Sequence, residues 1–506
     1  MSKFKQKFTS MLKGRNFTSE LLAAVLIFVV VFVNVIIYTL DSYLGWYIYI
    51  AETPDFSISD TYSDTFLEAE GKEIRVTFCM PRTELEAHSS GSFVLKTADE
   101  FVKKYPNLFK LRFINLVTKY DQDGNDVKDE LEIYKDNGRG GQNYISEASV
   151  IFECGSNYRV LTDVVTGSGF ADFFTLDSNM YVTSYNGEEI FAAMSSWVLS
   201  DVHPEAYFTI GHGEAIMPTL YNVLLAAGYY VDTVNLRDAE DADEKLEGAD
   251  LIVISNPTTD IERSANPQIA TEYERIKNYA DKGGSLFVTV DPYAKRLDVF
   301  YSLLAEYGIS LYTTPDGERQ TVRDEVSGIT LDGFTFAASV SDTDSVSLGV
   351  KSKLDELGGA VILSDASPLV LTGEAKPLLI SSSNSVCYSG GEVTDTAGGY
   401  TMAAYSTLQS QLGEESKLFF IPTVYLTATD AMVTRGYANK DFLYSLFDEF
   451  FEMGEMPYGC NSILYDTTTL ENLTMGTART YTALLLLIPA VLCVVGVVTL
   501  IRRKNR

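Results

Sequence analysis

The chain has 506 residues, with 69 acidic and 39 basic side chains, a net charge of −30 and 46% apolar residues. This acidity argues against nucleic acid and anionic lipid headgroups as partners, because both would be repelled. The apolar content is high enough for packed cores, so a mainly disordered chain is excluded.

Two apolar runs near the ends of the chain are long enough to cross a membrane. At about 1.5 Å per helical residue, 21–40 and 483–501 can each span a hydrocarbon layer roughly 30 Å thick. Basic tails at 1–20 and 502–506 flank the two runs, and such tails stay in the cytoplasm. We therefore expect a two-pass cell-membrane protein with both termini cytoplasmic and the large central region outside. A cleaved signal peptide is the alternative for the first run, but its apolar region is usually only about 7–15 residues long.

The outer region is expected to hold two domains, joined to the membrane helices by linkers at 41–70 and 453–482. The first domain, 71–203, has alternating strand patterns and a strand–helix–strand order typical of an α/β unit. Its predicted strands are Glu73–Met80, Lys110–Leu116, Ala148–Cys154 and Tyr158–Leu161, and its predicted helices are Ala98–Tyr105 and Glu188–Val202.

The second domain, 204–452, has short apolar strands separated by helices of about 10–15 residues, which indicates a parallel sheet covered on both faces. Its predicted strands are Ala206–Ile210, Tyr230–Leu236, Leu251–Ile254, Ser285–Val290 and Lys417–Thr423. Its predicted helices are Ile216–Ala227, Pro267–Asp281, Arg296–Tyr307 and Asp441–Phe451, the last capped by Asn439. Residues 312–350 are rich in Thr, Ser, Asp and Gly, and the segment from about 312 to 395 is expected to form an insertion. The expected fold class is therefore α/β, with a smaller N-terminal α/β domain and a doubly wound parallel-sheet domain between two transmembrane helices.

The best candidate site lies where the predicted parallel strands end. It comprises a Gly-His-Gly-Glu segment and two residues at neighbouring strand ends: Gly211, His212, Gly213, Glu214, Asn256 and Asp291. The glycines permit a tight turn, and the start of the following helix can hold an anion. Carboxyl ends of parallel strands share one edge of the sheet, so these side chains should converge. Two interpretations remain open: an edge that binds a ligand or partner, or hydrogen bonds that only anchor the loops.

Signatures of catalysis are missing from the sequence. None of the predicted strands ends in a Gly-x-Ser-x-Gly nucleophile elbow. The three histidines, His88, His203 and His212, have no acid partner at a recognisable spacing. The sequence also has neither an ATP-binding phosphate loop nor a zinc-ligand cluster. We therefore expect no enzyme activity, no ATP hydrolysis by this chain and no cofactor.

Two weaker patterns concern cysteine and calcium. The five cysteines are scattered without a Cys-x-x-Cys pair, which favours buried thiols and leaves one long-range disulfide open. Residues 121–125 with Glu132 follow the spacing of a calcium-binding loop, but Asp126 stands where such a loop needs glycine. This segment is therefore expected to form a turn.

Several segments resemble the GldG-like family, auxiliary components of ABC transport systems first associated with gliding motility. The main similarity lies in TIGHGEAIMPTLYNVLLAAGYYVDTVNL, GADLIVISNPTTDI and IKNYADKGGSLFVTVDP. Further similar segments are NGEEIFAAMSSWV, GGYTMAAY, KLFFIPTVYLTATD and ANKDFLYSLFDEFF. The two membrane segments are also in keeping with that family.

The resemblance implies a membrane-anchored extracytoplasmic subunit that works beside an ABC permease and a separate cytoplasmic ATP-binding subunit. It also implies that the GHGE domain is related to glutamine-amidotransferase-like domains without their catalytic cysteine. Gliding itself is not implied. The alternative function is a stand-alone cell-envelope receptor that binds a sugar or peptide at the GHGE crevice, and a degenerate hydrolase is a third.

Overall fold

The computed structural model describes residues 56–69, 71–137, 142–161, 170–176, 181–266, 270–294, 297–410, 413–434, 436–453 and 456–464. These residues belong to one compact unit. Both predicted transmembrane segments and both basic tails lie outside them. Within the described ranges, no helix is long and apolar enough to cross a membrane.

The N-terminal part of the described chain, 56–203, is built on a five-stranded sheet with the order β3-β2-β1-β4-β5. Its main elements are β1 (Ile74–Phe78), α4 (Arg82–Ala87), α5 (Gly91–Lys104), β2 (Phe109–Asn115), β3 (Tyr120–Asp121), α6 (Lys128–Tyr134), β4 (Val150–Cys154), β5 (Asn157–Leu161) and α7 (Gly187–Leu199). β1 and β2 are parallel, and β4 and β5 form a hairpin, as the sequence predicts. One face of the sheet packs on α5 and α7, and the other packs on α6.

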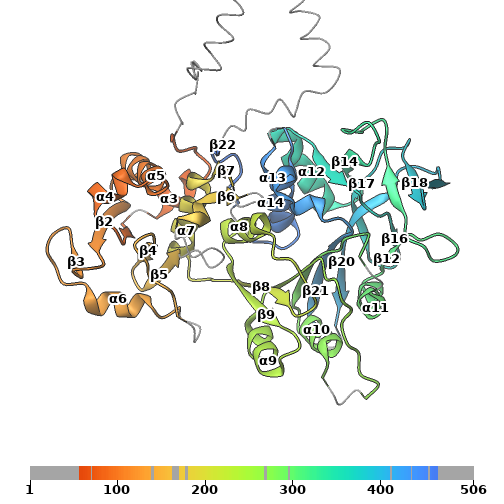
Figure 1. Ribbon diagram of the computed structural model, residues 1–506, viewed down its shortest axis with the longest axis horizontal. Coiled ribbons are helices and arrows are strands. Elements are labelled where there is room, and N and C mark those ends of the chain that lie inside the picture. Colours follow the sequence, from red (N-terminus) through yellow and green to blue (C-terminus); the bar gives the residue numbers. More distant parts are fainter. Residues whose placement is uncertain are drawn as a thin grey trace, which may run out of the picture. The chain divides into compact units, whose positions relative to one another are not determined.

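Parts of both predicted linkers are packed rather than extended. Residues 56–69 contain α3 (Ser63–Glu68), in which Phe66 is 3% exposed and packs its ring edge-on against Phe109. At the other end, β22 (Ile463–Leu464) pairs with β7 (Val182–Tyr185), which also pairs with β6 (Phe174–Leu176) (Figure 1). The linker prediction is therefore wrong for 56–69 and 456–464, because aromatic burial and strand pairing hold these residues on the unit.

The C-terminal part, 204–453, contains five parallel strands in the order β9-β8-β10-β11-β21. The elements of this region are β8 (Glu205–Ile210), α8 (Pro218–Ala226), β9 (Tyr230–Asn235), α9 (Ala239–Gly248), β10 (Leu251–Ser255), α10 (Glu272–Asp281), β11 (Ser285–Thr289), α11 (Asp298–Glu306), β21 (Glu415–Ile421) and α14 (Asn439–Glu449). Successive residues of β10 enter two different cores: Val253 packs in the core shared with α8 and α14, and Ile252 packs in the core shared with α9, α10 and α11. The sheet thus has helices on both faces (Figure 1), which explains why every residue of its strand β10 is buried.

Beyond β21 the sheet continues with antiparallel strands in the order β20-β17-β14-β15. The elements of this region are β12 (Ile309–Leu311), β13 (Thr321–Arg323), β14 (Thr335–Val340), α12 (Ser345–Leu357), β15 (Val361–Ser364), β16 (Leu369–Leu371), β17 (Lys376–Ile380), β18 (Val386–Ser389), β19 (Glu392–Asp395), β20 (Thr401–Gln409) and α13 (Thr429–Val433). Residues 312–395 therefore contribute four strands to the large sheet, β14 to β17, as well as a small sheet of their own, β13-β18-β19. The sequence interpretation missed α12, whose start is capped by the Asp344 carboxylate accepting from the backbone N–H of Val346 at 3.0 Å.

Asn439 does not cap α14 as predicted. It is the first helical residue and fully buried, and its Oδ1 accepts from the N–H of Ile362 at 2.8 Å. Its Nδ2 donates to the carbonyl of the same residue, also at 2.8 Å. The amide side chain therefore completes the backbone hydrogen bonds of the edge strand β15 and joins that strand to α14.

Candidate functional site

The strand order places a topological switch point between β8 and β10. The chain leaves β8 through α8 to β9 on one side, and then crosses to β10 on the other side. In open parallel sheets, ligands bind outside the carboxyl ends of the strands at such a point. The loops that follow β8 and β10 carry the Gly-His-Gly-Glu segment and Asn256, so the structure puts these parts of the candidate site at the expected edge.

Hydrogen bonds join the two loops directly. The carbonyl of His212 accepts from the N–H groups of Thr258 and Thr259 at 2.9 and 3.0 Å. The N–H of Ala215 donates to the carbonyl of Ser255 at 3.0 Å. Gly213 has a φ of 73°, and a Cβ there would lie 2.1 Å from the hydroxyl oxygen of Thr258. Glycine is therefore required by both the backbone conformation and the close approach of the second loop.

His212 lies buried between two carboxylates. Its N–H donates to Glu214 Oε2 at 2.6 Å, and its Nδ1 lies 3.3 Å from Oε1 of the same side chain. Its Nε2 lies 3.7 Å from Glu272 Oε1, which also lies 3.6 Å from Nε of Arg237. The side chain of His212 is 1% exposed. Burial alone would raise the pKa of Glu214, but hydrogen bonds from the ring and backbone of His212 and from its own backbone N–H outweigh burial and hold this pKa below its ordinary value.

Asn256 closes the neighbouring loop in a left-handed backbone conformation, with a φ of 53°. Its N–H donates to the carbonyl of Thr289 at 2.9 Å, and its Oδ1 accepts from the Thr289 hydroxyl at 3.2 Å. Its Nδ2 and the hydroxyl of Ser255 are buried without a hydrogen-bond partner among the described residues. Buried side-chain atoms without partners also occur elsewhere in the described residues, but these two belong to successive residues at the end of β10, where a ligand could complete their hydrogen bonds.

Two further details concern Asp291 and the start of the following helix. Asp291 accepts within its own turn, through Oδ1 from the N–H of Tyr293 at 2.8 Å and through its backbone carbonyl from the N–H of Ala294 at 3.0 Å, and its convergence with the other residues stays a prediction. The Gly-His-Gly-Glu segment also does not open the helix directly, because α8 begins at Pro218. Proline suits a first helical position but lacks an N–H, which weakens the predicted anion-binding role of this helix start.

The sequence interpretation missed Arg237 and Glu272, which complete the environment of His212. Arg237 follows β9, so the rule that located Asn256 could also have found it. Glu272 stands at the first position of α10, and nothing in the local sequence links this residue to a histidine 60 positions earlier. The other two histidines lie elsewhere: His88 accepts from the N–H of Gly91, and His203 stacks on Trp197.

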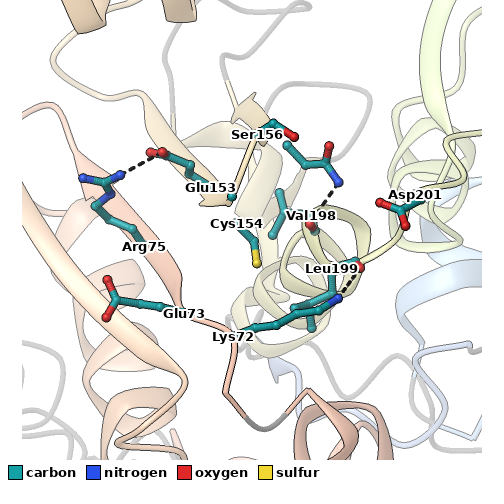
Figure 2. A pocket seen from close by; sticks show the side chains of 11 residues that line it. Lys72, Glu73, Arg75, Glu153, Cys154, Ser156, Val198, Leu199 and Asp201 are labelled. Atoms are coloured by element: carbon teal, nitrogen blue, oxygen red, sulfur yellow. Dashed lines mark hydrogen bonds and ion pairs between the residues drawn. The ribbon is translucent and has the colours of Figure 1, made fainter.

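A cavity of about 510 Å³ lies at the end of α7, away from these residues (Figure 2). Its polar side chains largely complete the last turn of that helix: Lys72 donates to the carbonyl of Leu199 at 3.2 Å, and Asn157 donates to that of Ser200 at 2.9 Å. Arg75 pairs with Glu153 at 2.8 Å. Cys154 faces the cavity, but burial raises the pKa of its thiol and makes it a poor nucleophile. These contacts account for the cavity as part of the fold.

The segment 121–125 forms a turn, as expected. Asp121 Oδ1 accepts from the N–H groups of Asp123 and Asn125, and its Oδ2 pairs with Arg112 at 3.1 Å. Glu132 points to Lys135 at 2.6 Å. Because hydrogen-bond donors of the protein occupy the carboxylates of Asp121 and Glu132, these side chains are not arranged as a calcium site. Within the described ranges, no group of three or more acidic, histidine or cysteine side chains could hold a metal ion.

A further polar cluster lies at the first turn of α7, where the two ends of the described chain meet. Glu188 accepts through Oε1 from the N–H of Ser59 at 2.7 Å and through Oε2 from the N–H of Asn461 at 2.7 Å. Asn461 also donates from Nδ2 to the carbonyl of Ser57 at 2.8 Å. One buried carboxylate therefore binds both segments that lead toward the predicted membrane helices.

Comparison with known proteins adds little to this description. No known family profile matches the sequence, and no curated protein matches it significantly. Several solved structures match about half of the chain. The mmIFT52 N-terminal domain is 16% identical, with 48% of this chain and 96% of that chain covered and a TM-score of 0.36. A ThuA-like protein from Bacteroides uniformis is 12% identical, with 48% and 89% covered and a TM-score of 0.29. PurLQS from Thermotoga maritima is 12% identical, with 49% and 99% covered and a TM-score of 0.28. These similarities are too low to carry an argument. The contacts within this chain define a mixed α/β protein with a parallel sheet and a polar cluster at its switch point.

Proposed function

We propose that the chain is a non-enzymatic, membrane-anchored extracytoplasmic subunit of an ABC transport system of the export or efflux type. In this proposal it acts beside a separate permease and a cytoplasmic ATP-binding subunit. The described unit would be the extracytoplasmic region, with a glutamine-amidotransferase-like C-terminal part, and residues 21–40 and 483–501 would hold it on the membrane.

The observation that carries this proposal is the meeting of the two chain ends at Glu188. Asn461 reaches the N-terminal segment at Ser57, and the Thr61 hydroxyl donates to the carbonyl of Tyr458 at 2.5 Å. The segments that lead to the two predicted spans therefore leave the unit from one place. This arrangement suits a protein anchored on one membrane face by both ends.

The first turn of α8, which follows the Gly-His-Gly-Glu loop, lies near the C-terminal segment, because its Thr219 and Ser462 line the same cavity of about 160 Å³. Two spans are too few to form a transport path alone, and the sequence has no ATP-binding loop, so transport would need both other subunits.

Co-purification tests this proposal. A tagged full-length chain is extracted with a mild detergent and isolated, and the bound proteins are identified by mass spectrometry. We expect a multi-span permease and an ATP-binding protein in constant ratio to the chain. A second tagged two-pass membrane protein from the same cells is the control. Recovery of neither subunit, or equal recovery with the control, contradicts the proposal.

A second candidate function is a stand-alone envelope receptor, favoured by the buried unpartnered atoms of Ser255 and Asn256. In that case the crevice beside His212 binds a sugar or peptide. Binding to glycan and peptide arrays, compared between the wild-type chain and a His212→Ala variant, tests this candidate. Equal binding by both, together with an empty crevice in a ligand-soaked structure, argues against it.

A further inference from the structure

A small cavity lies at the junction between the N-terminal part of the chain, 56–203, and the C-terminal part, 204–453. Its volume is about 160 Å³, and its lining comes from α7, β6 and β7 on one side and from α8, α13 and α14 on the other. In this region α8 packs against both α7 and α14 (Figure 1). None of the lining residues belongs to the Gly-His-Gly-Glu site or to the larger cavity at the end of α7.

An ion pair forms the charged part of the lining. Nζ of Lys440 donates to Glu189 Oε2 at 2.7 Å, and the hydroxyl of Tyr444 donates to Oε1 of the same carboxylate. The Glu189 side chain is 3% exposed, and that of Lys440 is 26% exposed. The remaining donors of the Lys440 ammonium group have no partner among the described residues. Since an ionised carboxylate can accept about four hydrogen bonds, Glu189 also keeps free acceptor positions.

A second polar group lines the cavity from α8. Among the described residues, the side-chain amide of Asn222 has no hydrogen-bond partner. The other asparagine in the lining, Asn186, is already engaged, because its Nδ2 donates to the Thr175 hydroxyl at 2.6 Å. The unused hydrogen-bonding capacity of the cavity therefore lies mainly with Lys440 and Asn222, on two neighbouring helices.

Apolar side chains complete the lining, and one side of the cavity is accessible from solvent. Val223 of α8 and two residues of α13, Met432 and Val433, form the apolar part. Ser462 is exposed and Lys440 is partly exposed, so a ligand can enter here without movement of the chain. A protein cavity of about 150 Å³ can hold a molecule of benzene's size, so a ligand of roughly six non-hydrogen atoms fits this one.

We propose that this cavity binds a small α-amino acid such as alanine. The ligand carboxylate accepts from Lys440 and from the amide of Asn222, its ammonium group donates to Glu189, and its short side chain packs on Val223. The site goes beyond the transport proposal, because it rests on contacts within the chain alone.

Charge balance favours a zwitterion over other small ligands. The charges of Lys440 and Glu189 cancel, so a ligand with a single charge would leave that charge unbalanced in a largely buried place. An uncharged ligand would lack charge-assisted hydrogen bonds, which are about twice as strong as those between neutral groups. A zwitterion keeps the site neutral and gains such bonds at both of its ends.

Equilibrium dialysis of radiolabelled L-alanine against the purified full-length chain tests the proposal. We expect saturable binding. Propionate lacks the ammonium group and ethylamine lacks the carboxylate, so each should compete at least about ten times less well than unlabelled alanine. Absence of saturable alanine binding means that the cavity holds only water, and equal competition by propionate means that the zwitterion is not recognised; either result overturns the proposal. The assay needs no permease or ATP-binding subunit, so its result is separate from that of the co-purification.

Two variants assign the binding to this cavity. Asn222→Asp places a carboxylate beside the ligand carboxylate, and we expect alanine to bind at least about ten times more weakly because like charges repel. Asn278→Asp makes the same change on the exposed side of α10 and should stay within about twofold of the wild type. Equal affinity of Asn222→Asp and the wild type overturns the proposal, because alanine then binds elsewhere.

Val433→Phe keeps the inference testable if Asn222→Asp does not fold. The larger side chain fills the apolar part of the cavity and leaves Lys440, Glu189 and Asn222 unchanged. We expect at least about a tenfold loss of alanine binding, because a close-packed site has no space for both groups. Undiminished binding by this variant also overturns the proposal.

Discussion

Asn461 and Ser57, 404 positions apart in the chain, are joined by a hydrogen bond of 2.8 Å from the side-chain amide of one to the carbonyl of the other. The Glu188 carboxylate accepts from the backbone N–H of Asn461 and from the backbone N–H of Ser59, two residues after Ser57. The first and last described segments are therefore neighbours. This relationship connects the predicted membrane topology with the folded unit, and it motivates the first prediction.

We predict that the unit between the two apolar runs lies outside the membrane and that both termini lie inside. In intact cells carrying an N-terminal or a C-terminal tag, an added protease should remove the central region and spare both tags. After permeabilisation the tags should also be lost, which serves as the control. Digestion of either tag in intact cells is incompatible with two spans of this orientation.

Loss of the Glu189 carboxylate should strongly destabilise the junction. Glu189→Gln leaves the Lys440 ammonium without its partner in a largely buried place, and we expect the free energy of unfolding to fall by about 3 kcal/mol. Denaturant unfolding followed by tryptophan fluorescence measures the change. Glu100→Gln breaks an exposed pair with Lys103 and should cost less than about 1 kcal/mol. Similar losses in the two variants would show that the junction pair does not stabilise the fold.

Acid should weaken the turn at Asp121. Burial would raise the pKa of this carboxyl, but hydrogen bonds from Asn125, Arg112 and Asp123 outweigh it and lower the pKa from 3.8 to about 2. Between these two values the unfolded chain binds more protons than the folded chain, so stability rises with pH there. The contribution of Asp121 is complete above about pH 4 and is lost as the pH falls toward 2.

The measurement is denaturant unfolding across this pH range. Asp121→Asn should flatten the dependence of stability on pH between about 4 and 2, because the titrating group is gone. Asp123→Asn, in the same turn but exposed, is the control and should retain the wild-type slope. An unchanged slope in Asp121→Asn would mean that other carboxylates account for the acid sensitivity.

Asn439→Ala should destabilise the edge strand β15. The change leaves the N–H and carbonyl of Ile362 buried without their partner, at a cost of about 1–3 kcal/mol. Hydrogen exchange of the Ile362 amide should also accelerate. Asn384→Ala, at an exposed position, is the matched control. Equal stability of the two variants would assign Asn439 no role in holding α14 on the sheet.

Comparison of Gly213→Ala with Gly155→Ala separates the cost of an unfavourable backbone conformation from the cost of a steric clash of the added Cβ. Both positions have positive φ, but a Cβ at 155 meets open space, whereas at 213 it meets Thr258 at 2.1 Å. We expect losses of about 1 kcal/mol at 155 from the backbone alone and about 2–4 kcal/mol at 213. Denaturant unfolding compares the two. Equal losses would show that the loop beside His212 can move away from Thr258.

The local sequence pattern was sufficient to predict those helices and strands that form because of their own residues. The continuous apolar run of β10 and the spacing of α8 and α11 predicted a parallel sheet with helices on both faces, because strands buried on both sides need no polar alternation. The rule that the carboxyl ends of parallel strands share one edge of the sheet then correctly predicted that residues 211–214 and Asn256 lie on adjacent loops. The Asp291 carboxylate accepts from the N–H of Tyr293 within its own turn, and its convergence with these residues stays a prediction.

The sequence by itself determined the acidic character, the two long apolar runs and the parallel core, since charge, length and periodicity are local properties. Only the tertiary structure decided the pairing of Glu272 with His212, the use of Asn439 on β15 and the meeting of Ser57 with Asn461. Each of these contacts joins residues that are distant in the chain. Their side chains come together only after the apolar cores have placed the elements, so no local pattern can reveal them.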